Sequence, residues 1–458
     1  MALDCTPLPS LYCVLHVSSA SEASKHFATI ASTHARNALL GRSADGVTSF
    51  KGIPYAKPPV GELRWKAPQA PDPSDEEIEC YNFGYTALQP EWHTEPASYY
   101  PKSEDCLTLN IWESDGTAGS GERKPVMVYF HGGAYGWGGT TDPIYDGQNF
   151  AKAHGDVILV TCNYRLGLMS FADFSQVEGG EEYQDINLGI RDHIAALQWI
   201  QKNIAAFGGD PGNVTIFGES AGAWSTTALT ISPKARGLFK RAIAQSGEVA
   251  PKSRKAAQAY ADFIMEASGA KNMDELLAIS GDEWMKLDAE KHIADECCYV
   301  VVDGDIIPED LDKAIEDTAK SGFVTETWRY EILDFADRFA DAGGDVRVYL
   351  WMVPSTKDIM FKSAVHAVEL AYVFNNLENV EYSGEVDPAV ASKAQESWVN
   401  FAKTGDPSIS EAEWKAYDTD TRDTMVIAKD GWACVSGPSK TARELLDKAY
   451  GDEPYHVW

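Results

Sequence analysis

The chain has 458 residues, of which 44% are hydrophobic and 24% charged, a composition typical of a folded globular protein rather than a disordered, collagenous or coiled-coil chain. Its net charge is −30, from 69 acidic and 39 basic residues, so we expect neither nucleic acid nor an anionic membrane surface as a partner. No apolar run approaches the ~20 residues of a membrane-spanning helix. We therefore expect a soluble protein.

Predicted strands and helices alternate along the chain. The middle strands are apolar almost throughout, as expected for parallel strands covered by helices on both faces. The pattern therefore predicts an α/β fold. In chain order we predict strands at 108–113, 125–133 and 157–165, a helix at 189–205, a strand at 214–220, a helix from 221, and strands at 241–247 and 346–353.

The N-terminus differs from the rest of the chain. An apolar stretch at 11–17 is followed by small residues, in the manner of a secretory signal, but no Lys or Arg precedes Lys25. We expect residues 1–33 to be a poorly ordered extension and residues 34–458 to form a single domain. The predicted location is the cytoplasm rather than the exterior.

A serine between two glycines follows one of the predicted strands. The stretch GESAG (218–222) comes directly after the apolar run VTIF and before a segment compatible with a helix. Glycines at these positions permit a sharp turn from strand to helix, with the serine at the apex in a strained conformation. The helix also presents its first N–H groups to developing negative charge. The spacing therefore predicts that Ser220 is a nucleophile rather than a turn residue.

A glycine-rich loop follows an earlier predicted strand. The stretch FHGGAYGWGG (130–139) has small side chains that let backbone N–H groups approach a bound group. The alternative is an ordinary glycine-rich turn. Because this loop and the serine turn occur in the chain order of a serine ester hydrolase, we predict a loop that stabilises an oxyanion.

Longer motifs accompany these two features over most of residues 36–450. They are FKGIPYAKPPVGELRWKAPQ (50–69), SEDCLTLNIW (103–112), VYFHGGAY (128–135), NYRLG (163–167), FGGDPGNVTIFGESAGAWS (207–225), GLFKRAIAQSG (237–247), SAVHAVELAYVFNN (363–376) and WVNFAKTGDP (398–407). Together they resemble the type-B carboxylesterase family, the branch of the α/β-hydrolase fold that also holds cholinesterases and para-nitrobenzyl esterases. The resemblance implies a mostly parallel central sheet with helices on both faces.

The resemblance also implies catalytic roles. Ser220 matches the family nucleophile, and His366 in VHAVEL matches the general base. The backbone N–H groups of Gly133, Ala134 and Ala221 match the oxyanion hole. This loop reads Gly-Gly-Ala where many relatives have three glycines, but alanine still offers its N–H.

Three further residues match supporting positions of the family. Arg165 and Asp192 correspond to a structural ion pair beside the site, and Glu369 to a residue that supports the helix after the histidine.

The sequence departs from the family at the triad acid, which relatives carry in a GTxxDEG-like loop between nucleophile and histidine. Residues 300–322 resemble the segment before that loop, but residues 323–344 already resemble the later helix that runs into the last strand. Only 146 residues separate Ser220 from His366, several tens fewer than in relatives. We therefore expect one late strand and part of the lid region to be absent.

Three explanations of the missing acid remain open. A substitute carboxylate acts on the histidine, with Asp303 as the first candidate and Asp305 and Glu326 behind it. Alternatively the enzyme uses a Ser-His dyad, or the chain is a deletion variant with impaired activity. Loss of a triad acid costs on the order of 10⁴-fold in rate, so activated esters would still be cleaved.

A second departure concerns cysteine. Relatives that have the early disulfide join the cysteine of SEDC, here Cys106, to one in an FGxxCxQ stretch, where this chain has Ala87. Cys80 is close enough in sequence to substitute. The simpler inference is a free thiol in a reducing compartment.

The predicted function is a serine carboxylesterase that hydrolyses small-molecule esters through an acyl-enzyme, without metal or cofactor. Tyr135, Trp137 and Trp224 flank the reactive centre in sequence and either line an acyl pocket or belong to the core. The missing acid leaves one alternative, a non-catalytic cholinesterase-like binding protein.

Overall fold

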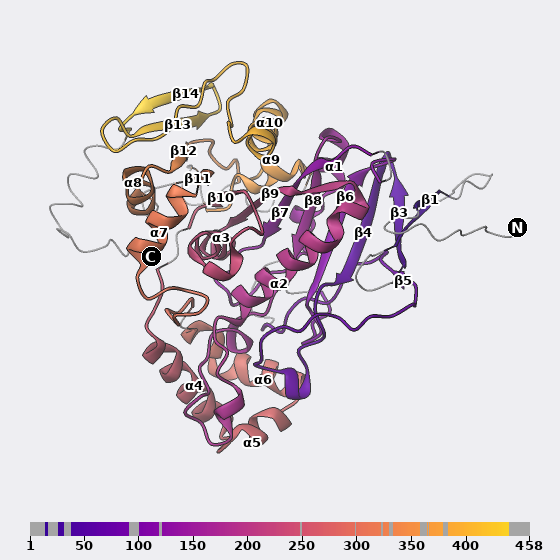
Figure 1. Cartoon of the computed structure of the whole chain (residues 1–458), viewed down its shortest axis with the longest axis vertical. Helices are drawn as coiled ribbons and strands as arrows, with labels where there is room; N and C mark the ends of the chain where they lie inside the picture. Colours follow the sequence, from indigo (N-terminus) through magenta and orange to yellow (C-terminus); the bar gives the residue numbers. More distant parts are fainter. Residues whose placement is uncertain are drawn as a thin grey trace, which may run out of the picture.

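The structure is a computed structural model of the whole chain. It describes residues 14–16, 26–31, 38–90, 100–118, 121–247, 250–297, 299–321, 324–328, 333–357, 364, 366–378 and 383–438. Within these ranges, the chain folds into a large twisted sheet with helices against it (Figure 1).

The strands form one sheet in the order β1-β2-β3-β4-β6-β8-β7-β9-β10-β11-β12-β13-β14, with the short β5 beside β3. The run from β8 to β13 is parallel, and antiparallel strands extend the sheet at both ends. The expected α/β-hydrolase fold is confirmed. The strands are β1 (Val14–His16), β2 (His26–Ala31), β3 (Ala38–Ala44), β4 (Val47–Pro54), β5 (Ile78–Glu79), β6 (Thr108–Ser114), β7 (Lys124–Phe130), β8 (Ile158–Cys162), β9 (Gly209–Glu219), β10 (Arg241–Gln245), β11 (Val324–Trp328), β12 (Asp345–Trp351), β13 (Asp423–Ala428) and β14 (Gly431–Ser436).

Helices cover both faces of the sheet, as the apolar strands predicted. Alternate residues of β7 enter two separate hydrophobic clusters, Val128 on one face and Tyr129 on the other. Helices α2, α3, α7 and α8 supply the first cluster, and α1, α9 and α10 the second. The helices are α1 (Gln148–Ala153), α2 (Leu188–Asn203), α3 (Ala221–Ile231), α4 (Arg254–Ser268), α5 (Met273–Ala278), α6 (Gly281–Lys291), α7 (Leu311–Lys320), α8 (Leu333–Asp341), α9 (Leu370–Phe374) and α10 (Pro388–Thr404).

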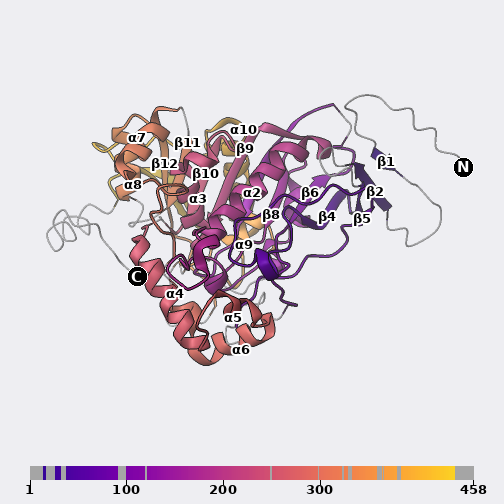
Figure 2. The same cartoon turned by 60° about the horizontal axis from the view of Figure 1, so that its bottom comes forward.

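Helices α4, α5 and α6 form a group of their own at one end of the molecule, away from α10 and the β13–β14 hairpin (Figures 1 and 2). The short 3₁₀ helix Ile293–Glu296 follows this group and packs against another, Gly167–Met169, which comes soon after β8. The helical group is thereby connected to the edge of the sheet where the parallel strands end.

The sheet has no gap where a late strand was expected to be missing. Strand β11 comes from the start of segment 323–344 and pairs in parallel with both β10 and β12. The same segment then forms α8 and leads into β12, as its sequence indicated. The chain therefore keeps a continuous sheet, because the segment that resembles a later helix of the family first forms a strand.

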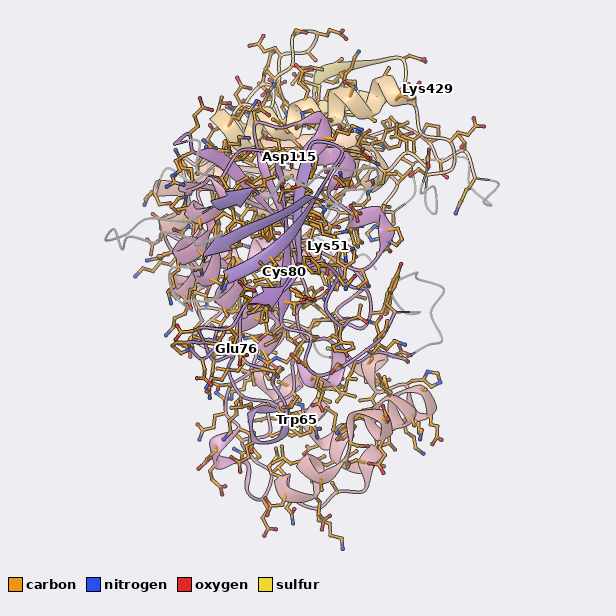
Figure 3. The ribbon with its side chains drawn as sticks, turned by 90° about the vertical axis from the view of Figure 1, so that its right-hand side faces the viewer. Lys51, Trp65, Glu76, Cys80, Asp115 and Lys429 are labelled. Atoms are coloured by element: carbon orange, nitrogen blue, oxygen red, sulfur yellow. The ribbon has the colours of Figure 1, made fainter. Side chains whose placement is uncertain are left out.

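Two strands come from the predicted N-terminal extension. Strand β1 pairs with β2, and β2 pairs with β3 over Ala38–Ser43. Most of residues 1–33 lie outside the described ranges, so the domain boundary near residue 33 stays a prediction. Figure 3 shows this side of the molecule, with Lys51 and Cys80 labelled on adjacent segments; the Lys51 N–H donates to the Cys80 carbonyl at 2.8 Å.

In the part of the chain that the structure describes, no helix combines the length and apolarity needed to cross a membrane.

Candidate active site

Ser220 lies at the turn between β9 and α3, as predicted. Its backbone has φ 55° and ψ −120°, a strained conformation for a residue with a side chain. The turn is held on both sides, because the Ser220 N–H donates to the Gln245 carbonyl at 2.9 Å and its carbonyl accepts from the Trp224 N–H at 3.0 Å. The side chain is half-buried at the end of β9.

The second glycine of the GESAG motif is required by close packing. A Cβ at Gly222 would lie 2.0 Å from the carbonyl oxygen of Phe130, the last residue of β7. Helix α3 can therefore approach β7 only with glycine at this position. This explains the GESAG pattern in physical terms.

The glycine-rich loop after β7 has an unusual backbone. Gly133, Ala134 and Tyr135 all have positive φ values, of 103°, 49° and 56°. Among the described residues, the N–H groups of Gly133 and Ala134 donate no hydrogen bond. The N–H of Ala221 opens α3, where the first donors have no acceptor within the helix. All three predicted oxyanion donors are thus unengaged within the described structure.

His366 comes from the turn before α9. Its Nε2 lies 3.0 Å from Oε1 of Glu219, the residue directly before Ser220. The imidazole is 57% exposed, whereas the Glu219 side chain is 4% exposed. Because Cα atoms of neighbouring residues are only about 3.8 Å apart, this contact brings His366 to the nucleophile turn.

Glu219 is a site residue that the sequence analysis missed. It occupies the variable position of the Gly-x-Ser-x-Gly pattern, to which the sequence alone gave no role. A Cβ at Gly132 would lie 2.8 Å from Glu219 Oε2 and 3.2 Å from Ser220 Cβ, so the carboxylate fills the space under the oxyanion loop. The sequence did offer a signal for this role, because Glu219 is an acidic residue directly before Ser220 at the end of an apolar strand.

Glu369 lies beside this pair and is fully buried. Its Oε1 accepts from Gln245 Nε2 at 3.3 Å, and its backbone carbonyl accepts from the N–H groups of Tyr372 and Val373 at the start of α9. Burial, with the nearby charge of Glu219, raises the pKa of Glu369 to about 7. These contacts agree with the predicted role in supporting the helix after His366.

The candidate substitute acids have other partners. Asp303 Oδ1 accepts from the backbone N–H groups of residues 305, 306 and 307, and its Oδ2 accepts from Asn187. Asp305 pairs with Arg191 at 3.0 Å and Lys234 at 2.8 Å. Both aspartates therefore stabilise local structure. The side chain of Glu326, in β11, lies outside the described residues.

Arg165 and Asp192 form the predicted ion pair. Arg165 Nη2 lies 2.6 Å from Asp192 Oδ1, and both Nε and the backbone N–H of Arg165 donate to Oδ2. The remaining Nη1 donates to the Lys66 carbonyl at 2.8 Å. Both side chains are almost completely buried, so the pair fixes the segment after β8 to α2.

Aromatic side chains lie around the start of α3. Tyr135 is fully buried, and its hydroxyl is 3.0 Å from Ser225 Oγ. Its ring lies 5.7 Å from Trp224, which is half-buried and 5.4 Å from Tyr299. Tyr135 is therefore a core residue, whereas Trp224 keeps an accessible part beside the turn.

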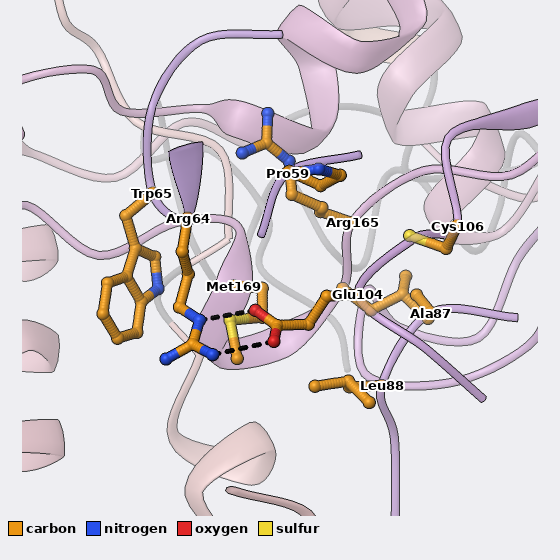
Figure 4. Close-up of a pocket in the computed structure, with 10 residues that line it drawn as sticks. Pro59, Arg64, Trp65, Ala87, Leu88, Glu104, Cys106, Arg165 and Met169 are labelled. Carbon is orange, nitrogen blue, oxygen red and sulfur yellow. Dashed lines mark hydrogen bonds and ion pairs between the residues drawn. The ribbon is translucent and has the colours of Figure 1, made fainter. Parts of the chain in front are cut away.

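The cavity in Figure 4 is separate from these groups. Its walls include Arg64, Glu104, Cys106 and Arg165, but neither Ser220 nor His366. Cys106 and Cys80 are free thiols, and burial raises the pKa of Cys80 to about 12. No substitute disulfide forms between them. Within the described ranges, no cluster of three or more His, Cys, Asp or Glu side chains is arranged to hold a metal ion.

Comparison with known proteins decides the family. The protein-family model described as "Carboxylesterase family" matches residues 35–322 and 264–444. The chain is 33% identical to the para-nitrobenzyl esterase of Bacillus subtilis over 90% of its own length and 98% of that protein's. The chain belongs to the carboxylesterase family.

Other carboxylesterase relatives agree in sequence and structure. The phenmedipham hydrolase of Pseudarthrobacter oxydans is 28% identical over 86% of this chain and 94% of its own length. A thermophilic para-nitrobenzyl esterase superposes with a TM-score of 0.81 at 30% identity, covering 91% of this chain and 99% of the other. A Geobacillus stearothermophilus carboxylesterase superposes with a TM-score of 0.78 at 32% identity, covering 90% of this chain and 99% of the other. The protein is therefore a carboxylic ester hydrolase, and a non-catalytic binding role is not favoured.

Proposed function

We propose that Ser220 is the nucleophile and His366 the general base of this carboxylesterase. The N–H groups of Gly133, Ala134 and Ala221 form its oxyanion hole. The observation that carries the proposal is the strained turn at Ser220, with the imidazole of His366 in contact with the preceding residue, Glu219.

The reaction proceeds in two halves. Ser220 Oγ attacks the ester carbonyl carbon while the imidazole of His366 takes the hydroxyl proton, and the carbonyl electron pair moves to the oxygen. The unengaged N–H donors stabilise that oxygen in a partly dry site. The imidazolium then gives its proton to the leaving alcohol, and an acyl-enzyme remains. Water, activated by the same imidazole, releases the acid.

The surroundings of the nucleophile suit a small apolar acyl group. Trp224 and Tyr299 place aromatic surface beside the turn, and such surface binds apolar ligand parts favourably. Short-chain para-nitrophenyl esters are therefore suitable test substrates.

The test is hydrolysis of a short-chain para-nitrophenyl ester by the wild type and by Ser220→Ala. We expect a burst of para-nitrophenol from the wild type and a loss of at least about 10⁴-fold in kcat for the variant. Labelling by an organophosphonate, followed by peptide mapping, should modify Ser220 alone. Equal rates for wild type and Ser220→Ala would refute the proposal.

A further inference from the structure

We infer that Trp224 limits the length of the acyl group that this esterase accepts. The inference rests on the proposed roles of Ser220 and His366. It makes Trp224 a residue that determines specificity rather than one that takes part in making or breaking bonds.

Trp224 is exceptional within α3. It lies in the first turn of this helix, and its N–H donates to the Ser220 carbonyl at 3.0 Å. Every other residue of α3 is buried, whereas Trp224 is half-buried. The largest side chain of the helix is therefore the one that keeps accessible surface, and it does so beside the half-buried Ser220.

The indole is fixed against the Ser220 turn. A Cβ at Gly247, just after β10, would lie 2.8 Å from Trp224 Cδ1 and 2.7 Å from the Ser220 carbonyl oxygen. The ring and the turn thus press on the same glycine. Tyr299 lies 5.4 Å from the indole in an edge-to-face arrangement, and Tyr135 lies 5.7 Å away. Aromatic rings packed in this way form a wall that yields little to a ligand.

The course of the reaction decides which part of the ester meets this wall. After Ser220 Oγ has attacked, the former carbonyl carbon also carries the oxyanion, the alkoxide and the acyl chain. The oxyanion points toward the N–H donors of the loop after β7, and the alkoxide points toward His366, which supplies its proton. The acyl chain takes the remaining direction.

The two sides of the turn belong to different hydrophobic clusters. Ala367, directly after His366, enters the cluster that contains α9 and α10. Trp224 and Tyr299 pack against the cluster on the opposite face of the sheet. The alcohol therefore leaves on the α9 side of Ser220, and the acyl chain extends toward Trp224.

A rigid aromatic wall discriminates by length. A short acyl chain fits in front of the indole, whereas each further methylene has to displace packed side chains. One methylene too many in a hydrophobic pocket costs about 10- to 200-fold in kcat/KM. The substrates are therefore esters of short-chain acids, and esters of long-chain acids are excluded by Trp224.

The first test compares kcat/KM for para-nitrophenyl butyrate and para-nitrophenyl octanoate. We expect wild type to favour butyrate at least about tenfold, and Trp224→Ala to reduce this ratio at least about tenfold by gaining activity on octanoate. The matched control is Trp432→Ala, which removes a half-buried tryptophan of β14 at the far end of the sheet. Its ratio should stay within about threefold of wild type. A wild type without preference, or an unchanged ratio in Trp224→Ala, would overturn the inference.

The second test varies the alcohol instead of the acid. Ethyl butyrate and hexyl butyrate share one acyl group, and their alcohols lie on the α9 side. The ratio of their kcat/KM values should therefore be the same in wild type and in Trp224→Ala. A change in this ratio as large as the change in the acyl ratio would show that Trp224 does not act on the acyl side.

Two further variants keep the outcomes distinct. A ratio measured on one preparation does not depend on its folded fraction, so general damage to the fold leaves it unchanged. If Trp224→Ala does not fold, Trp224→Leu decides: a ratio reduced at least about threefold supports the inference, and an unchanged ratio overturns it.

Ser220→Ala identifies the other failure. If this variant hydrolyses the butyrate ester as wild type does, the proposed function is wrong. If it is inactive while Trp224→Ala keeps the wild-type ratio, only the inference about Trp224 is wrong.

Discussion

Two buried charge clusters lie at the edge where the parallel strands end, and they are built in opposite ways. After β8, Arg165 satisfies its donors with Asp192 and a backbone carbonyl. After β9, Glu219 Oε1 lies 3.0 Å from His366 Nε2 and Glu369 accepts from Gln245. Within the described structure Glu219 Oε1, Glu369 Oε2 and Gln245 Oε1 are buried without a hydrogen bond. The first arrangement stabilises the fold. The second leaves polar groups available for a reacting molecule.

Backbone conformation separates the same two regions. The turn after β9 and the loop after β7 contain Ser220, Ala134 and Tyr135 at positive φ, whereas neither Arg165 nor Asp192 has a positive φ. Strain of this kind costs about 1 to 3 kcal/mol per residue, so the active site is maintained by the stability of its surroundings. The two clusters should therefore respond differently to substitution.

Removal of one partner from the satisfied pair should have the largest effect on stability. Asp192→Asn leaves the Arg165 charge buried without compensation, and we expect a loss of about 3 to 5 kcal/mol in the free energy of unfolding. Urea denaturation measures it. The control is Glu182→Gln: the Glu182 side chain is 81% exposed in its ion pair with Lys66, so the loss should stay below about 1 kcal/mol. Equal losses for the two variants would remove the distinction between the clusters.

The cluster of Glu219 and Glu369 should instead affect how the free energy of unfolding depends on pH. The pKa of Glu369 rises from 4.5 to about 7 on folding, so the folded chain binds more protons than the unfolded chain between these values. Stability from this group is full below pH 4.5 and is lost as the pH rises through 7, by about 3 kcal/mol. Glu369→Gln should remove that part of the decline in unfolding free energy measured from pH 5 to 8. Parallel wild-type and variant curves would contradict this.

The tight turn at Ser220 should give a smaller effect on stability. Gly222→Ala places a Cβ 2.0 Å from the Phe130 carbonyl oxygen, whereas Gly116→Ala at φ +80° meets nothing within 4 Å. Both variants introduce a side chain, but only the first also forces α3 away from β7. We expect the free energy of unfolding of Gly222→Ala to be about 2 kcal/mol lower than that of Gly116→Ala. Equal midpoints of the two variants in thermal or urea unfolding would show that the close approach of residue 222 to the Phe130 carbonyl does not determine stability.

The features that sequence predicted well are those that depend on neighbouring residues. Ser220 and Gly222 are recognisable because a strand, a sharp turn and a helix follow one another within a dozen residues. Arg165 and Asp192 were assigned through the family resemblance, and their contacts agree with it. Local geometry and a matched motif suffice in such cases.

The partner of His366 could not be predicted in this way. Glu219 and His366 are 147 positions apart, and their contact exists only because β9 and the turn before α9 meet in the folded sheet. The family resemblance pointed instead to Asp303, Asp305 and Glu326, which lie between Ser220 and His366 in the sequence. Similarly, β11 has a strand conformation because β10 and β12 lie on either side of it.

The bidentate contact between Arg64 and Glu104 has a practical consequence (Figure 4). The same guanidinium donates to the carbonyls of Leu277 and Ile279 at the end of α5, so one side chain connects the segment before β6 to the outlying helices. The connection is therefore ionic and hydrogen-bonded rather than covalent. Such a tie forms without an oxidant and is untouched by reducing agents, so the protein can be produced and handled in dithiothreitol without loosening this connection.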